Sequence, residues 1–560
     1  MTAPPVARTL GALVDEMAAR QPQAEAVVFR DQRLTYAELR ARVDELARAL
    51  LASGIARGDR VAVLMPNRPE WIIAALATAS IGGIVTAIST FSTARELGWA
   101  LEHSGASALV MVPAFRGREY LAALHELCPE LGGNQPGALR SARLPRLHTI
   151  VAVDERRHDG VFHPSDLVGL AARVTSRAYD AAGRAVTPDD VCYILYTSGS
   201  TATPKGVMLA HGGVVANGFA IGERQRLTAA DRLWLVVPLF WSFGSANALP
   251  AILTHGGAVV LQESFEPGEA LALLERERCT VYYGMANMAR AMLEHPDRSR
   301  CALSTMRTGL TIGLPEDIEL TIAAAGAREL CNVYGSTETY GNCAVTDAHD
   351  PLAVRLHTQG RPLPGMTIRA VHPETRQPLG AGEVGELCVR GLVTPGYYGS
   401  PEQTASAFDR DGFFLTGDLG LIDDDGRVRF RGRLKEMIKT GGINVAPLEV
   451  EEVLLQHPDV TQAYVVGVPD RQKDEIVAAA VELRPGAAAD TDALVAFCRE
   501  RLASYKVPAR VVLRQADEFP RTPTGKIHKP ALRLEMGGSG RPPCPPRGGP
   551  GVNPGPPRVP

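Results

Sequence analysis

One twelve-residue segment, rich in hydroxyl side chains and glycine, limits the possible folds of this chain more than any other. The segment, Tyr196-Thr-Ser-Gly-Ser-Thr-Ala-Thr-Pro-Lys-Gly-Val207, follows 191–195, a short apolar run that predicts a buried strand. Backbone N–H groups of such a loop can converge on anionic oxygens, the hydroxyls add donors, and Lys205 supplies a positive charge. The segment predicts a polyphosphate site at the end of a strand, although a solvated turn would be the default for such a loop alone.

This segment is not a P-loop, which needs Gly-x-x-x-x-Gly-Lys-Ser/Thr. Gly199 is followed five residues later by Pro204, and Gly206 follows the lysine. The segment instead resembles YTSGSTGxPKGV, the phosphate-binding signature of adenylate-forming enzymes, the superfamily of acyl-CoA synthetases, luciferases and peptide-synthetase adenylation domains. Ala202 stands where that family has glycine. If this position needs positive φ, alanine costs about 1 kcal/mol, so we expect altered ATP handling but not lost activity.

By this resemblance, one group of residues in the segment binds the nucleotide. They are Thr197, Ser198, Gly199, Ser200, Thr201 and Lys205.

Size and composition limit the class of protein. A chain of 560 residues exceeds one ordinary core and predicts two or more domains. The formal net charge of −3 gives no general attraction to nucleic acid or to an anionic membrane. Nine cysteines are scattered singly, which predicts reduced thiols in the cytoplasm and neither a disulfide framework nor a zinc site.

The sequence predicts neither a secretory signal nor a stable membrane span. No basic stretch followed by an apolar one opens the chain. Residues 71–91 carry no charge and are long enough to cross a bilayer, but Gly82 and Gly83 interrupt them. We expect a helix over 69–81 and a buried strand from 84.

The pattern of elements predicts an α/β fold. Helical and strand-like segments alternate from about residue 9 to 385, which favours parallel-sheet α/β subdomains. Thr35 is a candidate N-cap for a helix, and 59–65 and 106–112 are candidate strands. Residues 385–433 change to short strands and turns, which indicates a β-rich subdomain.

We expect a large N-terminal AMP-binding domain over 1–432. A small, mobile α+β C-terminal domain over 433–536 and a disordered Pro- and Gly-rich tail over 537–560 follow it.

A second element, Asn332-Val-Tyr-Gly-Ser-Thr-Glu338, resembles the family's YGxTE motif. A hydroxyl and a carboxylate beside a glycine turn can meet ATP phosphate and Mg²⁺, which needs few carboxylates when phosphate oxygens complete its shell. The resemblance implies that Thr337 contacts the α-phosphate, Glu338 serves Mg²⁺ and Tyr334 packs near adenine. Taken alone, such a string reads better as a surface turn.

Two further elements, Gly385–Gly391 and Thr416-Gly-Asp418, match the family in order. Asp418 is then the residue that binds the ribose hydroxyls, because a carboxylate can accept two hydrogen bonds from a diol. In Gly432-Arg-Leu-Lys-Glu-Met-Ile-Lys439, Arg433 would contact ribose or phosphate, and Lys435 stands at the family's hinge. A charged, solvated linker is the alternative reading.

The C-terminal region completes the match. By resemblance, Lys439, Gly441 and Gly442 lie in the loop that approaches the thiol donor, although the same residues also read as a turn before a helix over 448–454. Pro520-Arg-Thr-Pro-Thr-Gly-Lys526 resembles the family's catalytic loop. Lys526 would neutralise charge on the α-phosphate during adenylation.

The acyl pocket is the least specific part of the prediction. Trp241 replaces the family's histidine in Pro238-Leu-Phe-Trp-Ser-Phe-Gly244, and no aspartate is present there to pair with an amino-acid ammonium. The candidate wall suits an apolar acyl or aryl group, although the same residues can equally be ordinary core. It comprises Trp241, Tyr283, Met285, Thr308, Gly309 and Tyr340.

The resemblance implies chemistry in two halves. A carboxylate attacks the α-phosphorus of MgATP to give an acyl adenylate and pyrophosphate, and a thiol such as CoA then displaces AMP. Three functions stay open from the sequence: an acid–CoA ligase, an adenylating enzyme that loads an acyl carrier protein or another acceptor, and a non-catalytic protein with a decayed site. Retention of Lys526, Glu338, Asp418 and Arg433 argues against decay.

Overall fold

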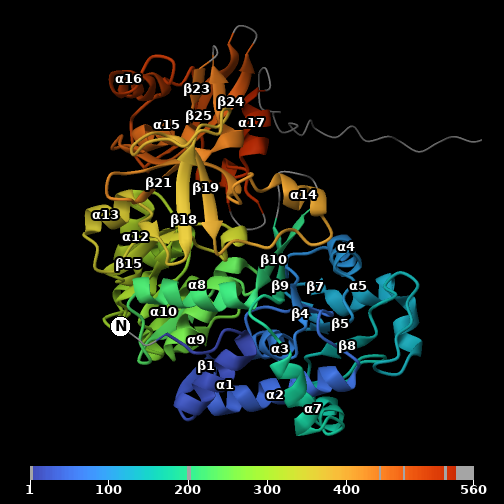
Figure 1. Cartoon of the computed structure of the whole chain (residues 1–560). Helices are drawn as coiled ribbons and strands as arrows, with labels where there is room; N and C mark the ends of the chain where they lie inside the picture. The colour runs from blue at the N-terminus through green and yellow to red at the C-terminus, as the bar shows by residue number, and fades with distance from the viewer. Residues whose placement is uncertain (1–3, 198–203, 441–442, 471–472, 523–525, 538–560) are drawn as a thin grey trace, which may run out of the picture. The chain divides into compact units, whose positions relative to one another are not determined.

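The computed structural model divides the chain into two compact units, Met1–Arg431 and Gly432–Pro560. Figure 1 colours both along the chain. The residues described are 4–197, 204–440, 443–470, 473–522 and 526–537, without the side chains of 443 and 444. The expected tail therefore lies outside the described residues from 538 onward.

Within the described residues, the first sheet of the large unit has the order β10-β9-β4-β3-β5-β8. Its strands are β3 (Arg60–Leu64), β4 (Ile84–Ala87), β5 (Ala108–Met111), β8 (Thr149–Ala152), β9 (Val191–Thr197) and β10 (Lys205–Ala210). All neighbours are parallel except β9 and β10. The connection from β9 to β10 is too short for a crossover, so the two strands form an antiparallel hairpin.

The second sheet has the order β17-β16-β15-β14-β13-β11-β12-β1-β2 in the described part of the chain. Its strands are β1 (Glu25–Phe29), β2 (Gln32–Thr35), β11 (Arg232–Leu235), β12 (Ala258–Leu261), β13 (Val281–Tyr283), β14 (Thr308–Thr311), β15 (Glu329–Tyr334), β16 (Ala344–Val345) and β17 (Arg361–Pro362). From β15 to β1 the strands are parallel, and β2, β16 and β17 run antiparallel at the edges. The two sheets confirm the predicted α/β body.

Helices follow most of these strands. They are α1 (Leu10–Arg20), α2 (Tyr36–Ala52), α3 (Pro69–Ser80), α4 (Ala94–Ser104), α5 (Tyr120–Leu127), α6 (Pro164–Ala171), α7 (Ser176–Arg184), α8 (His211–Arg224), α9 (Leu249–His255), α10 (Pro267–Arg276), α11 (Ala286–Glu294), α12 (Pro315–Ala325), α13 (Leu352–His357) and α14 (Pro401–Ser406). Thr35 caps α2 in a capping box with Glu38, as predicted. The uncharged stretch forms α3 and β4, also as predicted.

Short turns and small sheets complete the large unit. The turns are η1 (Pro129–Gly133), a π-helix η2 (Phe243–Ala248), η3 (Pro296–Ser299) and η4 (Thr337–Thr339). A small hairpin pairs β6 (Ala114–Phe115) with β7 (Arg118–Glu119). The predicted β-rich region forms an antiparallel sheet of β18 (Met366–Val371), β19 (Gly385–Gly391), β20 (Phe414–Ile422) and β21 (Val428–Arg433).

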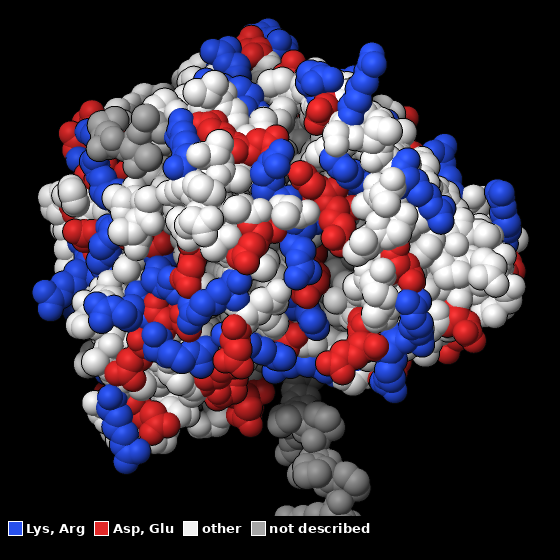
Figure 2. All heavy atoms as spheres, turned by 90° about the horizontal axis from the view of Figure 1, so that it is seen from below, with Lys and Arg blue, Asp and Glu red and all other residues white. Residues whose placement is uncertain are grey.

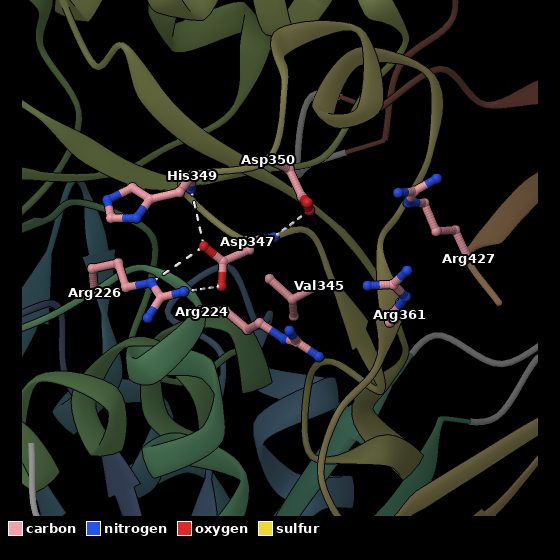
Figure 3. Close-up of a pocket in the computed structure, with 8 residues that line it drawn as sticks. All are labelled: Arg224, Arg226, Val345, Asp347, His349, Asp350, Arg361 and Arg427. Atoms are coloured by element: carbon pink, nitrogen blue, oxygen red, sulfur yellow. Dashed lines mark hydrogen bonds and ion pairs between the residues drawn. The ribbon is translucent and has the colours of Figure 1, made fainter. Parts of the chain in front are cut away.

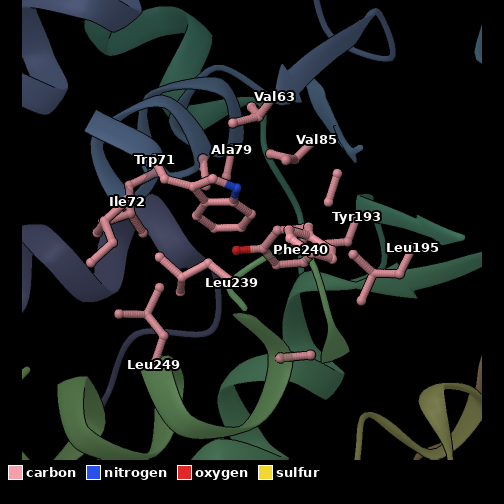
Figure 4. Packing of buried hydrophobic residues seen from close by; sticks show 14 of the residues in the cluster. Val63, Trp71, Ile72, Ala79, Val85, Tyr193, Leu195, Leu239, Phe240 and Leu249 are labelled. Atoms are coloured by element: carbon pink, nitrogen blue, oxygen red, sulfur yellow. The ribbon is translucent and has the colours of Figure 1, made fainter. Parts of the chain in front are cut away.

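Trp71 of α3 anchors the core beneath the first sheet. Its ring is fully buried, and Figure 4 shows it between Tyr193 of β9, Val85 of β4 and the segment that carries Phe240. Burying a side chain of this size contributes about 1.5–3 kcal/mol or more to folding. The core therefore fixes the segment just before Trp241, one of the predicted pocket residues.

The small unit packs its own core on a mixed sheet. Its strands are β22 (Ile438–Thr440), β23 (Ile443–Val445), β24 (Val460–Asp470), β25 (Asp474–Leu483) and β26 (Arg510–Leu513). Its helices and turns are η5 (Leu434–Glu436), α15 (Pro447–Leu455), α16 (Thr491–Arg501), η6 (Ala516–Glu518) and α17 (Lys529–Gly537). This confirms the predicted α+β class of the second domain.

Positive and negative side chains intermix on the molecular face in Figure 2. None of the helices that the structure describes is long and apolar enough to cross a membrane.

Candidate active site

The carboxyl ends of β11, β13, β14 and β15 lie along one edge of the second sheet, because these strands are parallel neighbours. In open parallel sheets this edge is where ligands bind. Thr337 and Glu338 follow β15 on the turn η4, and Ser242 follows β11. The Oγ atom of Ser242 lies 3.0 Å from Oγ1 of Thr337, so one hydrogen bond joins the two loops. Predicted site residues from two strands therefore share this edge.

Tyr397 connects the phosphate-loop lysine to the predicted metal-binding carboxylate. The Nζ atom of Lys205 lies 4.6 Å from the centre of the Tyr397 ring, a cation–π distance. The hydroxyl of Tyr397 donates to Oε1 of Glu338 over 3.0 Å. Burial, and then the charge of Glu338, raise the pKa of Tyr397 above its ordinary value, so the phenol stays a donor.

The backbone around Glu338 is also fixed. Its carbonyl accepts a hydrogen bond from the Thr394 amide over 2.6 Å. The Thr394 hydroxyl donates to the carbonyl of Met208 on β10, and the Met208 amide donates to Gly396. Segment 394–398 thus holds the turn after β15 beside the hairpin that carries the phosphate loop.

Asp418 and Tyr334 meet in a second part of the site. The buried Asp418 lies on β20, and its Oδ2 accepts a hydrogen bond from the Tyr334 hydroxyl over 3.1 Å. Burial, and then the Asp418 charge, raise the pKa of Tyr334 well above its ordinary value. The Tyr334 ring stacks on Phe430 at 6.0 Å, which presents flat apolar surface next to a carboxylate. An aromatic ring and a carboxylate acceptor are groups that can contact a purine and a ribose diol, respectively.

Part of the predicted nucleotide site lies outside the described residues, namely Ser198, Gly199, Ser200 and Thr201, together with Ala202. The two residues that flank this gap are described. Thr197 ends β9, Lys205 begins β10, and the two are paired in register across the hairpin. The loop therefore starts and ends at adjacent positions, as a cradle for an anion requires.

In the small unit, Arg433, Lys435 and Lys439 have exposed side chains. Arg433 ends β21, Lys435 lies in η5, and Lys439 lies in β22. The predicted thiol-donor residues Gly441 and Gly442 lie outside the described residues.

Lys526 follows the undescribed residues 523–525, and its carbonyl accepts a hydrogen bond from the Thr522 amide over 2.7 Å. The Lys526 side chain is exposed to solvent, but the surrounding protein partly desolvates its ammonium group. This desolvation lowers the pKa of Lys526, and the positive charge of Arg433 lowers it further. A nearby like charge disfavours the charged form of a lysine, which adds to the effect of desolvation.

Lys529 ties the catalytic-loop region to the predicted hinge. Its Nζ lies 2.9 Å from Glu451 of α15 and 3.3 Å from Glu436 of η5. Burial disfavours the ammonium, but the two carboxylates outweigh this effect and raise the pKa of Lys529. Glu451 also accepts a hydrogen bond from the Val465 amide of β24 over 2.7 Å. The two ion pairs of Lys529, here called the clamp, are therefore attached to the sheet.

The candidate acyl-pocket residues fall into two groups. Trp241 and Met285 are half-buried and follow the carboxyl ends of β11 and β13. Tyr283 is fully buried, and its hydroxyl donates to Asn247 over 3.0 Å and accepts from Gln225 over 2.8 Å.

The other three residues are Thr308, Gly309 and Tyr340, and each has a structural role. Thr308 lies at the amino end of β14, away from Thr337, and its hydroxyl donates to the carbonyl of Glu329. A Cβ atom at Gly309 would lie 2.2 Å from the carbonyl oxygen of Tyr282, so only glycine fits. The Tyr340 hydroxyl accepts the Ala210 amide over 3.2 Å. Their part in an acyl pocket stays a prediction.

The donor set at Glu338 fits Mg²⁺ bound together with phosphate. Among the described residues, no group of three or more His, Cys, Asp and Glu side chains could hold a metal. Glu338 is half-buried, and within the described ranges its second oxygen, Oε2, has no protein partner. A single carboxylate is enough for Mg²⁺ when phosphate oxygens and water complete the octahedron.

Sequence reasoning missed Tyr397, Phe430 and Ser242. The Tyr397–Glu338 bond joins residues 59 positions apart, and the Ser242–Thr337 bond joins residues 95 apart. Ser242 lies in the family-like element Pro238–Gly244, but neither this element nor the sequence around Tyr397 and Phe430 marks such a contact.

Comparison with known proteins decides the family. The family model "AMP-binding enzyme" matches residues 14–398, and "AMP-binding enzyme C-terminal domain" matches residues 449–526. The chain belongs to the AMP-binding enzyme family. A relative from Bacillus subtilis (strain 168), named putative acyl-CoA synthetase YngI, is 38% identical over 94% of this chain and 96% of its own length.

Other members of the family are also similar to this chain. The mitochondrial medium-chain acyl-CoA ligase ACSF2 of Bos taurus is 34% identical over 94% of this chain and 88% of its own length. The crystal structure of ATP-bound MatB from Rhodopseudomonas palustris superposes with a TM-score of 0.79 at 28% identity, covering 94% of this chain and 99% of MatB. Family membership confirms the predicted class of enzyme, an ATP-dependent acid–thiol ligase of the acyl-CoA synthetase type.

Proposed function

We propose that this chain joins an apolar carboxylic acid of medium length to CoA through an acyl adenylate. The relative ACSF2, whose name gives medium-chain acyl substrates, supports the chain length. The half-buried Trp241 and Met285 at the carboxyl ends of β11 and β13 support an apolar substrate. The observation that carries the proposal is the contact chain from Lys205 through Tyr397 to Glu338, which groups a cation, a donor and a carboxylate where ATP phosphates would bind.

In the first half-reaction, the substrate carboxylate attacks the α-phosphorus and pyrophosphate leaves. Lys205 and the phosphate loop hold the departing phosphates, and Thr337, whose hydroxyl is positioned by Ser242, donates to the α-phosphate. Asp418 accepts the ribose hydroxyls while the Tyr334 ring covers the adenine. Glu338 would hold Mg²⁺, which neutralises phosphate charge when bound. Lys526 stabilises the extra negative charge at the α-phosphorus.

In the second half-reaction, the CoA thiol loses its proton, attacks the acyl carbon and expels AMP. We propose that the small domain, over 433–536, turns about Lys435 between the halves, with Lys439, Gly441 and Gly442 facing the thiol donor. A domain rotation lets one site serve two reactions in turn. A cytoplasmic location belongs to the same proposal, since the eight cysteines that the structure describes are free thiols.

The test is mass-spectrometric detection of acyl adenylate and acyl-CoA from purified protein, MgATP and a series of linear and aryl acids. We expect acyl-CoA that requires ATP and CoA, with the highest kcat/KM for apolar acids of medium length. Lys526→Ala should remove the product, whereas Lys473→Ala, at an exposed lysine of the same unit, should not.

The other outcomes separate the alternatives. An acyl adenylate that reaches a carrier protein but never CoA would replace the proposal with a carrier-loading enzyme. A preference for short polar acids would refute the apolar substrate, and no product from any acid would refute catalysis.

A further inference from the structure

An arginine-lined pocket lies at the opposite end of β15 from the candidate active site. β16 runs antiparallel to β15, so Val345 and the residues after it lie toward the amino end of β15, whereas Thr337 and Glu338 follow its carboxyl end. The pocket has a volume of about 280 Å³. None of the residues that line it belongs to the predicted site; they are Arg224, Arg226, Val345, Asp347, His349, Asp350, Arg361 and Arg427.

Three guanidinium groups of this pocket each bond to the protein through only some of their N–H groups. Arg361 donates Nε to the carbonyl of Asp425 over 3.0 Å, and Arg427 pairs with the carboxylate of the same Asp425. Arg224 donates one N–H to the carbonyl of Pro362 over 3.3 Å. Among the described residues, neither Arg224 nor Arg361 makes an ion pair. Figure 3 shows the three guanidinium groups gathered on one side of the pocket.

The acidic side chains of the pocket are already engaged. Asp347 accepts two hydrogen bonds from Arg226, at 2.7 and 3.2 Å, and a third from the His349 amide at 3.0 Å. Asp350 accepts the Asp347 amide over 2.8 Å. Of these two aspartates, only Asp347 pairs with an arginine in the described part of the chain, so Asp350 keeps its negative charge in the pocket. Four arginines against two aspartates still give the pocket lining a net positive charge.

An apolar groove of about 480 Å³ continues from the same pocket. The two cavities share Arg224, Arg226 and Asp347. The groove follows one face of α8, and its apolar lining comprises Pro4, Pro5, Val215, Ala216, Phe219, Ala220 and Pro364. Arg8 and Glu223 also line the groove, so one end of the combined cavity is cationic and the other has mainly apolar walls with one charge of each sign.

We propose that this combined cavity is a second binding site, for a soluble amphiphile with an oxyanion head and an apolar chain. Guanidinium groups pair with phosphate or carboxylate oxygens through two parallel hydrogen bonds. The groove would take the chain, since small-molecule sites combine an apolar wall with a few polar groups that fix orientation. The chemistry that Arg224, Arg361 and Arg427 recognise is shared by a phosphate ester and a carboxylate.

Charge complementarity decides between this ligand and other occupants. The chain's own Pro-rich segment over 538–560 carries Arg541, Arg547 and Arg558 and no acidic residue, so its charge repels the pocket. The residues that line the head-group pocket come from α8, β16, β17, the segments next to them and the turn before β21, and together they form a concave site of the size of a single small molecule. A lipid surface would instead need an exposed basic face.

Calorimetric titration of the full chain with octyl phosphate, below its micelle concentration, tests the proposal. Inorganic phosphate and octanol serve as probes of the head and of the chain alone. We expect octyl phosphate to bind at least tenfold more tightly than either probe. The double variant Arg224→Gln/Arg361→Gln should weaken octyl phosphate at least tenfold, and Arg410→Gln, at an exposed arginine outside both cavities, should not.

Two further measurements keep the test decisive. Arg361 is exposed, so Arg361→Gln alone leaves the fold intact and should weaken octyl phosphate at least threefold. Ala216→Glu in the groove should weaken octyl phosphate but not inorganic phosphate.

Four results would overturn the site. These are equal binding of octyl phosphate and octanol, equal binding of octyl phosphate and phosphate, unchanged binding in the double variant, and Arg361-dependent binding only to phosphatidic acid vesicles.

Discussion

Tyr397 is the residue that contacts two separate parts of the proposed phosphate site. Its ring contacts Lys205 and its hydroxyl contacts Glu338, so one side chain sets the distance between a cation and a carboxylate. Sequence alone could name Lys205 and Glu338, because each lies in a motif. It could not name Tyr397, because that contact depends on how segment 394–398 pairs with β10.

Replacing Tyr397 with phenylalanine keeps the ring over Lys205 and removes the donor to Glu338. A hydrogen bond to a charged group contributes about 1.5–3 kcal/mol, so we expect kcat/KM for adenylation to fall at least about tenfold. The apparent affinity for Mg²⁺ should change as well. Tyr398→Phe is the matched control, since its hydroxyl donates to the Ser104 carbonyl instead. Equal rates for the two variants would show that the Tyr397 hydroxyl plays no part.

The lowered pKa of Lys526 predicts the pH dependence of adenylation. The reaction needs the ammonium form, which a lysine with a lowered pKa loses at a lower pH than usual. We expect the alkaline limb of the pH profile, measured by pyrophosphate exchange, to lie below the ordinary lysine value of 10.5.

Removing the positive charge in Arg433→Met should move this limb to higher pH. Arg499→Met, at an exposed arginine of the same unit, should leave it in place. An alkaline limb that does not respond to Arg433 would contradict the assignment.

Among the helices and strands, the sequence predicted those that are determined by neighbouring residues. The capped helix α2 and the succession of α3 and β4 follow from an N-cap, a helical period and a glycine pair. The order of strands in the two sheets could not be predicted, because it depends on pairings between distant segments such as β1 with β12. The predicted pocket roles of Thr308, Gly309 and Tyr340 stay predictions for a related reason, because residue type alone does not distinguish a pocket wall from a core.

The clamp at Lys529 should control the stability of the small unit. Lys529→Met leaves Glu451 and Glu436 without their cation, and losing one partner of a largely buried ion pair destabilises by several kcal/mol. We expect the unfolding free energy, measured in urea, to fall by at least about 2 kcal/mol. Lys506→Met removes the more exposed pair with Glu449 and should cost less than about 1 kcal/mol. Equal losses would mean that burial of the clamp does not matter.

At the scale of the whole molecule, the two units have separate cores and meet in sequence at Arg431 and Gly432. The resemblance of Gly432–Lys439 to the family's hinge region led to the proposed hinge at Lys435, which lies in the 3₁₀ turn η5 directly after β21. Lys435→Pro should therefore spare adenylation and block thioester formation, whereas Lys435→Ala should spare both. The two half-reactions measured separately decide this, and a parallel loss of both in Lys435→Pro would refute the hinge.

We propose that one site performs both half-reactions and that Lys526 serves only the first. The most direct measurement compares wild type and Lys526→Ala in ATP–pyrophosphate exchange and in thioester formation from preformed acyl adenylate and CoA. We expect Lys526→Ala to lower the rate of exchange at least a hundredfold, about 2.7 kcal/mol of transition-state stabilisation, and to keep thioester formation within about threefold of wild type. Retained exchange, or loss of both reactions together, would contradict it.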